Sequence, residues 1–293
     1  MRPGRLRVAG APISWGVCEV PGWGHQLGPD RVLGEMRALG LAASELGPAG
    51  FLPDDPRGAA SLLGSYALAA VGGFVPLLLH DRAGDELLAL LAPLLDAYAT
   101  IGAGTMVLAA VGGEDGYDRR VRLDDGQWRT LLANLDLLAA AAAARGVVAT
   151  LHPHVGTVVE RPDEVRRVLE GCGIPLCLDT GHLLVGGGDP VELAAKAGDR
   201  VAHAHLKDVD AALADAVRRG ERGYADAVRQ GMYRPLGQGD LDVAGVVAGL
   251  EAGGYRGWYV LEQDTVLDAE PAPGGGPVAD VRASLDFLTG LAA

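Results

Sequence analysis

The sequence has 293 residues, of which 49% are hydrophobic and 22% are charged, values close to ordinary globular usage. This length suits one large domain or two small ones, and the composition excludes a disordered chain and a coiled coil. The 38 acidic residues outnumber the 25 basic ones, and the resulting net charge of -13 opposes binding to nucleic acid or to an anionic membrane.

Short apolar segments of strand length alternate with longer segments of helical periodicity, which is the pattern of repeated βα units. The predicted strands are Leu6–Ile13, Ala42–Leu46, Val71–Leu79, Thr105–Ala109, Val147–Leu151, Leu176–Leu178, Val201–Leu206 and Trp258–Leu261. The predicted helices are Arg31–Leu39, Gly58–Ala69, Asp85–Ile101, Gln127–Arg145, Pro162–Glu170, Pro190–Ala197, Val243–Ala252 and Val278–Leu291. Eight such units predict an α/β fold, a (β/α)8 barrel whose active site lies at the carboxyl ends of the strands. A doubly wound open sheet is the structural alternative.

One long segment interrupts this alternation. Residues 208–240 are too many for a βα loop, which usually has about 2–6 residues, and insertions on the catalytic face of a barrel are often lids. Within it, residues 211–230 have the periodicity of one or two extra helices. We therefore expect a single barrel over residues 1–293 with a lid-like insertion at about 208–240.

Cysteine usage and the amino-terminal segment bear on the compartment. The three cysteines form no C-x-x-C pair, so the sequence predicts neither a disulfide framework nor a cysteine zinc site, and a reducing cytoplasm is the natural expectation. The first residues lack a long apolar segment, and we expect neither a signal peptide nor a membrane span.

Histidines and carboxylates gather at the ends of the predicted strands. Alternate residues on a strand face the same side, so His152 shares a face with His154, and His203 shares a face with His205. Asp179 follows the sixth strand and Glu262 follows the eighth, so adjacent strand ends offer carboxylates and imidazoles together. These ligand types without thiolate suit Mn²⁺, Fe²⁺, Co²⁺, Zn²⁺ or Mg²⁺. The alternative is a rim of buried polar residues that satisfy one another. The strand-end histidines are His80, the pair His152 and His154, His182, and the pair His203 and His205.

Four further residues are candidates for contact with a substrate. Lys207 is one of only two lysines in a chain that otherwise uses arginine, and it lies two residues past His205. Trp15 and Glu45 follow the first two strands and are expected as pocket walls, with core packing as the alternative for the tryptophan. Glu160 either binds substrate or merely precedes a helix.

Seven segments, in order and spread over nearly the whole chain, resemble the inosose dehydratase branch of the xylose-isomerase-like sugar isomerase and epimerase barrels. They are APISWG (11–16), ELGPAGFLP (45–53), LHPHVGTVVE (151–160), LCLDTGHLLVGGGDP (176–190), RVAHAHLKDV (200–209), GMYRPLGQGDLD (231–242) and YRGWYVLEQD (255–264).

The resemblance implies one divalent ion, with manganese favoured. Epimerases of that superfamily hold it with Glu, Asp, His and Glu from strands five to eight. Asp179, His205 and Glu262 match the last three ligands. The first glutamate has no counterpart here, where the strand-five tip carries His154 or His152 as the remaining ligand.

The missing glutamate bears on the reaction, because the epimerases use their two glutamates as acid and base on opposite faces of the substrate. One carboxylate base fits elimination of water from a keto-inositol or related keto-sugar through an enediolate. Glu262 is the expected base. The acid candidates are His182, Lys207 and whichever of His152 and His154 does not bind the metal. His80, Trp15, Glu45 and Glu160 are expected around the keto-polyol.

Three other functions compete with this interpretation. A metal-dependent isomerase or epimerase of a ketose or inosose would share every metal ligand. A DNA-repair endonuclease shares the superfamily barrel, but the acidic charge opposes it. A barrel that binds a sugar without turnover is the third alternative. The sequence allows a homo-oligomer in each case.

Overall fold

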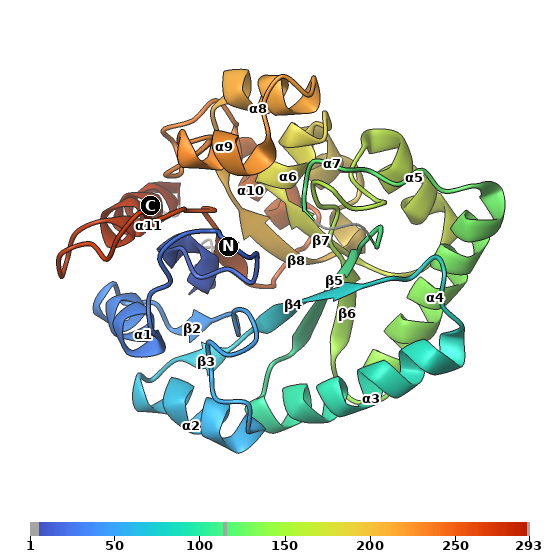
Figure 1. Ribbon diagram of the computed structural model, residues 1–293, viewed down its shortest axis with the longest axis horizontal. Helices are drawn as coiled ribbons and strands as arrows, with labels where there is room; N and C mark the ends of the chain where they lie inside the picture. The colour runs from blue at the N-terminus through green and yellow to red at the C-terminus, as the bar shows by residue number, and fades with distance from the viewer. Residues whose placement is uncertain (1–5, 114–115, 292–293) are drawn as a thin grey trace.

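A computed structural model of the chain describes residues 6–113 and 116–291 (Figure 1). A parallel sheet lies at its centre, with the strand order β3-β2-β1-β11-β8-β7-β6-β5-β4. These strands are β1 (Val8–Gly10), β2 (Ala43–Ser44), β3 (Ala69–Ala70), β4 (Gly72–Leu77), β5 (Thr105–Ala110), β6 (Val148–Leu151), β7 (Leu176–Asp179), β8 (Val201–Leu206) and β11 (Tyr259–Leu261). Each of the eight predicted strands is present. The third, predicted over Val71–Leu79, corresponds to β4, and Val71 divides β4 from the short strand β3, which was not predicted.

The division at Val71 closes the sheet into a barrel. The Val71 N–H donates to the carbonyl of Ser44 on the β2 side, and the Val71 carbonyl accepts from Gly104 and Thr105 on the β5 side. One residue therefore joins the two ends of the strand order, and the (β/α)8 prediction is confirmed.

Helices surround the barrel and begin where the sequence signals predict. Asp124 and Gln127 form a capping box at the start of α4, and proline occupies the first turn of α5 and α7. No helix in the described part of the chain combines the length and apolar character needed to cross a membrane. The helices of the barrel are α1 (Pro29–Ala38), α2 (Pro56–Ser65), α3 (Gly84–Ile101), α4 (Asp125–Ala143), α5 (Pro162–Gly171), α6 (Thr180–Val185), α7 (Pro190–Lys196), α10 (Val243–Ala252) and α11 (Pro277–Leu291), with the short 3-10 helices η1 (Pro12–Trp15) and η2 (Gly198–Arg200).

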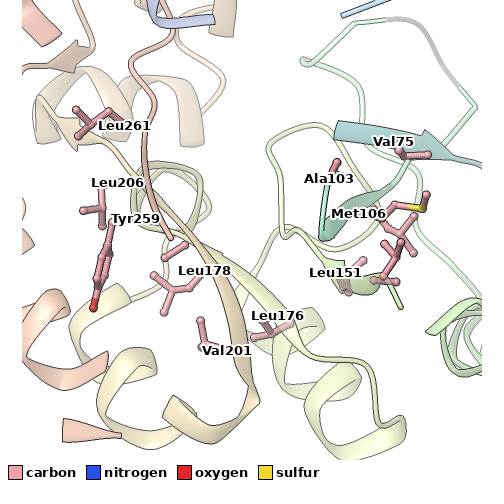
Figure 2. Close-up of a cluster of buried hydrophobic side chains, with 14 of the residues drawn as sticks. Val75, Ala103, Met106, Leu151, Leu176, Leu178, Val201, Leu206, Tyr259 and Leu261 are labelled. Carbon is pink, nitrogen blue, oxygen red and sulfur yellow. The ribbon is translucent and has the colours of Figure 1, made fainter. Parts of the chain in front are cut away.

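Alternation along the strands separates an apolar outer layer from the barrel interior. Leu178, Leu206 and Leu261 belong to the main hydrophobic core between strands and helices, part of which Figure 2 shows. The interior holds small residues such as Ala9 and Ala43, which form a separate buried cluster. Polar side chains take the interior positions near the carboxyl ends of the strands.

The insertion contains two helices, as predicted. They are α8 (Ala211–Arg218) and α9 (Tyr224–Arg229), which lie together beside α6 in Figure 1. The antiparallel strands β9 (Asp208–Val209) and β10 (Tyr233–Arg234) pair the two ends of the insertion. Its apolar side chains join residues of the barrel in a second hydrophobic cluster. From the barrel come Trp23, Val155 and Val185, and from the insertion Val209, Ala214, Tyr224, Ala227, Val228, Met232 and Tyr233. The insertion therefore packs on the barrel through a core of its own.

Candidate active site

Strand register brings the three expected metal ligands together. Asp179 is the last residue of β7 and lies opposite His205 on β8, which in turn lies opposite Val260 on β11. Opposite residues of parallel strands face the same side of the sheet. Glu262 follows two residues after Val260, so its side chain joins the other two at the mouth of the barrel.

The contacts among these ligands are short. His205 Nδ1 lies 3.1 Å from Glu262 Oε2 and 3.5 Å from Asp179 Oδ2. The other carboxylate oxygen of Asp179 accepts the N–H of His182 at 2.8 Å, which caps α6. This cap fixes the Asp179 carboxylate, so that Oδ2 points toward His205 and Glu262.

The two histidines after β6 take different positions. His152 Nε2 lies 3.2 Å from Asp179 Oδ2. His154 instead donates from Nδ1 to its neighbouring carbonyl, Val155 O, at 2.8 Å, and its ring lies 3.7 Å from that of His182 between centroids. Burial and the neighbouring His152 lower the pKa of His154 to about 3, so it is neutral. The geometry therefore favours His152 as the fourth ligand.

Glu45 orients the histidines from the opposite side. The end of β2 places its Oε1 2.8 Å from His203 Nε2 and 3.1 Å from His205 Nε2. Burial raises the pKa of Glu45, but the two imidazoles outweigh burial and hold the pKa below its usual range. An ionised carboxylate that accepts one ring N–H of a histidine is the usual outer partner of a metal ligand.

Lys207 is buried at the centre of the polar groups. Its Nζ lies 2.6 Å from Asp264 Oδ1, 2.9 Å from Glu262 Oε2, 3.1 Å from His182 Nε2 and 3.4 Å from Asp179 Oδ2. Burial lowers the pKa of Lys207, but the three carboxylates outweigh burial and raise it well above the usual value. The lysine is therefore charged, and it joins the ligand carboxylates to Asp264.

Sequence reasoning missed Asp264 and the tyrosines of the insertion. Tyr224 on α9 donates its hydroxyl to Asp264 Oδ2 at 2.7 Å and lies 2.9 Å from the hydroxyl of Tyr233. Burial raises the pKa of Asp264 even though the ammonium of Lys207 opposes the rise. The only sequence signal was the position of Asp264, two residues past Glu262 on the same barrel rim. The insertion thus supplies a hydrogen bond to the floor of the site.

We expect Tyr224→Phe to destabilise the protein by about 1–3 kcal/mol, because a buried hydrogen bond to a carboxylate is lost without loss of volume. Tyr66→Phe is the matched control, since the Tyr66 hydroxyl donates to Asp30 at 2.8 Å on an exposed surface and its loss should change little. Chemical denaturation of both variants measures the difference. Equal stabilities for the two variants would show that the Tyr224 bond does not hold the insertion.

A cavity of about 340 Å³ opens above these residues. Five of the expected site residues line it, namely Glu45, His152, His154, Lys207 and Glu262, and Asp264 lines it beside them. Asp179 and His205 lie beneath, buried among the lining residues. The volume is within the usual range for a small-molecule site.

Three expected pocket residues lie elsewhere. Trp15 is fully buried in the core, because η1 turns the chain and its Nε1 donates to Glu35 Oε2 of α1 at 2.8 Å. Glu160 pairs with Arg120 at 2.9 Å and accepts the N–H of Gly156, so it holds the loop after β6. His80 is buried after β4 and does not line the cavity. None of these three residues lines the cavity, and Trp23 is the tryptophan of the cavity wall.

The polar groups fit a divalent cation. When His205 donates from Nε2 to Glu45, the lone pair on Nδ1 faces two carboxylates, an arrangement that requires a cation or a proton between them. Ligand atoms of Asp179, His205 and Glu262 all lie within 4.8 Å of one another. Cys177 forms a second candidate group with His152 and His205, and burial raises the pKa of its thiol to about 11.

Comparison with known proteins agrees with this architecture. The family model described as "Xylose isomerase-like TIM barrel" matches residues 35–291. An inosose dehydratase of Geobacillus kaustophilus (strain HTA426) is 33% identical over 271 residues, which cover 88% of this chain and 87% of the relative. The rhizopine catabolism protein MocC of Rhizobium meliloti is 33% identical over 267 residues, which cover 88% and 82%.

Solved structures show the same fold at lower identity. A structure of L-ribulose 3-epimerase matches with a TM-score of 0.68 and 18% identity, covering 98% of this chain and 94% of the epimerase. The fold, the polar residues at the strand ends and the two relatives lead to one assignment: the chain belongs to the xylose isomerase-like TIM barrel family.

Proposed function

We propose that the protein is a metal-dependent hydro-lyase that removes water from a keto-inositol or a related keto-sugar. The observation that carries this proposal is the arrangement at the cavity floor. The Glu262 carboxylate and the Lys207 ammonium line the cavity 2.9 Å apart, while imidazoles lie at the tip of β6. The similarity to inosose dehydratases supports the same reaction class.

Asp179, His205, Glu262 and His152 would hold the divalent ion. Their carboxylate and imidazole ligands suit Mn²⁺, which we favour, and also Co²⁺, Fe²⁺, Zn²⁺ and Mg²⁺. A bound ion of this kind acts as a Lewis acid toward a ketone oxygen and makes the adjacent C–H more acidic. The Glu45 carboxylate keeps His205 in the orientation that this role requires.

Glu262 is the proposed base. Burial raises the pKa of Glu262, but His205 and Lys207 outweigh burial and lower it to about 2, so the group is ionised at neutral pH. The carboxylate takes the proton from the carbon next to the ketone. The electron pair left behind forms the new double bond as the C–O bond to the β-hydroxyl breaks, and the hydroxyl leaves as water after receiving a proton.

Lys207 is the proposed acid. His154 is neutral, and burial together with its neighbours lowers the pKa of His182 well below the usual value, so neither imidazole is in the acidic imidazolium form at neutral pH. Lys207 is charged and lines the cavity, whereas His182 does not. Asp264 holds the ammonium from behind at 2.6 Å and so directs it. An isomerase or epimerase would need a second base, and we find imidazole where a second carboxylate would stand.

The product decides between these reactions. We expect protein loaded with Mn²⁺ to convert 2-keto-myo-inositol into a dione that is lighter by one water and absorbs in the near ultraviolet. Mass spectrometry and absorbance record both signals in one incubation. A product of unchanged mass would contradict the lyase and establish the isomerase or epimerase.

The three described cysteines are all free, which agrees with our expectation that the reaction takes place in the cytoplasm.

A further inference from the structure

The cavity has two unlike sides. Its polar lining comes from Glu45 and from the strand ends β6, β8 and β11. A second part of the lining comes from the segments that follow β1 and β2 and from β4, and its side chains are mostly apolar apart from Cys18 and Glu19. Because β1, β2 and β3–β4 are neighbours in the barrel, these residues form one continuous surface, which we call the apolar wall. The wall consists of Ile13, Val17, Trp23, Pro48, Phe74 and Pro76.

Four side chains with polar atoms line the cavity near the apolar wall, namely Trp23, Cys18, Glu19 and Tyr117, whose ring lies 6.2 Å from that of Trp23 between centroids. Trp23 donates its Nε1 to the carbonyl of Thr265 at 2.9 Å, so the indole presents only carbon to the cavity. Burial raises the pKa of the Cys18 thiol to about 12, which keeps that side chain neutral. Glu19 is exposed at the entrance. Phe74 packs edge-on against His152, which joins the wall to the polar floor.

A free keto-inositol matches only half of this cavity. Such a ring carries a hydroxyl on every carbon except the ketone carbon. When the ketone faces Glu262 and Lys207, the carbon opposite the ketone faces the apolar wall. The six side chains of the wall offer no free hydrogen-bonding atom to a hydroxyl there, so its burial against them is unfavourable.

We propose that the preferred substrate carries an apolar substituent, an alkyl or aryl group in ether or glycosidic linkage, on the ring carbon opposite the ketone. The substituent packs on the apolar wall while the ketone meets the polar floor. This inference rests on the proposed function for the orientation of the ring. It assigns the wall a role in specificity and leaves the proton transfers to Glu262 and Lys207.

Binding and turnover test the two ideas separately. The unreactive ligands are myo-inositol and its 5-O-benzyl ether, measured by calorimetry on Mn²⁺-loaded protein. The reactive pair is 2-keto-myo-inositol and its 5-O-benzyl ether, measured by loss of water. We expect the benzyl ether of myo-inositol to bind at least about tenfold more tightly than myo-inositol, because the benzyl group leaves water for an apolar surface. The benzyl ether of the ketone should likewise react with a higher kcat/KM than the free ketone.

Variants locate the effect. Ile13→Asn places an amide on the apolar wall and should remove most of the preference for the ether. Val17→Thr keeps the volume of the side chain and should reduce the preference in the same direction. Leu90→Asn is the control, since Leu90 is exposed on α3 far from the cavity lining, and it should keep the wild-type preference.

The possible results distinguish failure of the substituent proposal from failure of the lyase proposal. Equal or weaker binding of the ether by the wild-type protein overturns the substituent proposal, whether or not water is lost. Tighter binding of the ether without loss of water from either ketone supports the wall and overturns the lyase. An unchanged preference in both Ile13→Asn and Val17→Thr also overturns the proposal.

Discussion

Asp179→Asn should remove the bound metal and lower kcat/KM by about 10³-fold or more, because the Lewis acid that activates the ketone is worth several kcal/mol. The fold should survive. Asparagine retains a side-chain oxygen that can accept the His182 N–H and cap α6. Metal content by atomic absorption, turnover and thermal unfolding measure the three effects.

Asp208→Asn is the matched control, because Asp208 is equally buried but its carboxylate accepts backbone N–H groups. Its Oδ2 accepts from Gly237 at 2.8 Å and from Gly239 at 3.0 Å, which holds the loop after the insertion. We expect this variant to lose stability and keep its metal, the reverse of Asp179→Asn. Unchanged metal content in Asp179→Asn would exclude Asp179 as a ligand.

Glu262→Gln should stop both loss of water and exchange of solvent deuterium at the carbon next to the ketone. The amide keeps the shape of the side chain but cannot take a proton, and a positioned base contributes about 10²–10⁴-fold to the rate. Nuclear magnetic resonance in deuterated water follows exchange and elimination in the same sample. Exchange that persists while elimination stops would assign Glu262 to the departing hydroxyl and the base to another residue.

Lys207→Gln distinguishes the acid from the base. Because the acid acts on the hydroxyl and not on the C–H, this variant should lose most of its elimination activity and retain measurable exchange. The double variant Lys207→Gln with Asp264→Asn controls for the unpaired carboxylate that the single change leaves behind, 2.6 Å from the lost ammonium. Loss of exchange in both variants at full metal content would contradict the division of roles.

The barrel and its ligands could be predicted because both depend on regular strands. Hydrophobic periodicity predicts each strand, and a parallel register then aligns residues such as Asp179 and His205 at one rim. The side of the strand on which a residue lies follows from alternation. His203 and His205 accordingly both reach Glu45 Oε1.

Prediction failed where the chain leaves the strand. β6 ends at Leu151, so alternation no longer governs His154, and only the turn decides that its ring meets His182 instead of the ligands. Trp15 lies in the 3-10 helix after β1, where the turn directs its indole to Glu35. Tyr224 reaches Asp264 from an insertion distant in sequence, and no local pattern encodes a contact of that kind.

Every role assigned above depends on where the divalent ion binds. The most direct measurement is anomalous diffraction from crystals of the Mn²⁺-loaded protein. We predict one ion at about 2.0–2.3 Å from side-chain atoms of Asp179, His205, Glu262 and His152, with His154 outside its reach. An ion that contacts fewer than three of those four residues, or one that His154 binds in place of His152, would contradict this assignment.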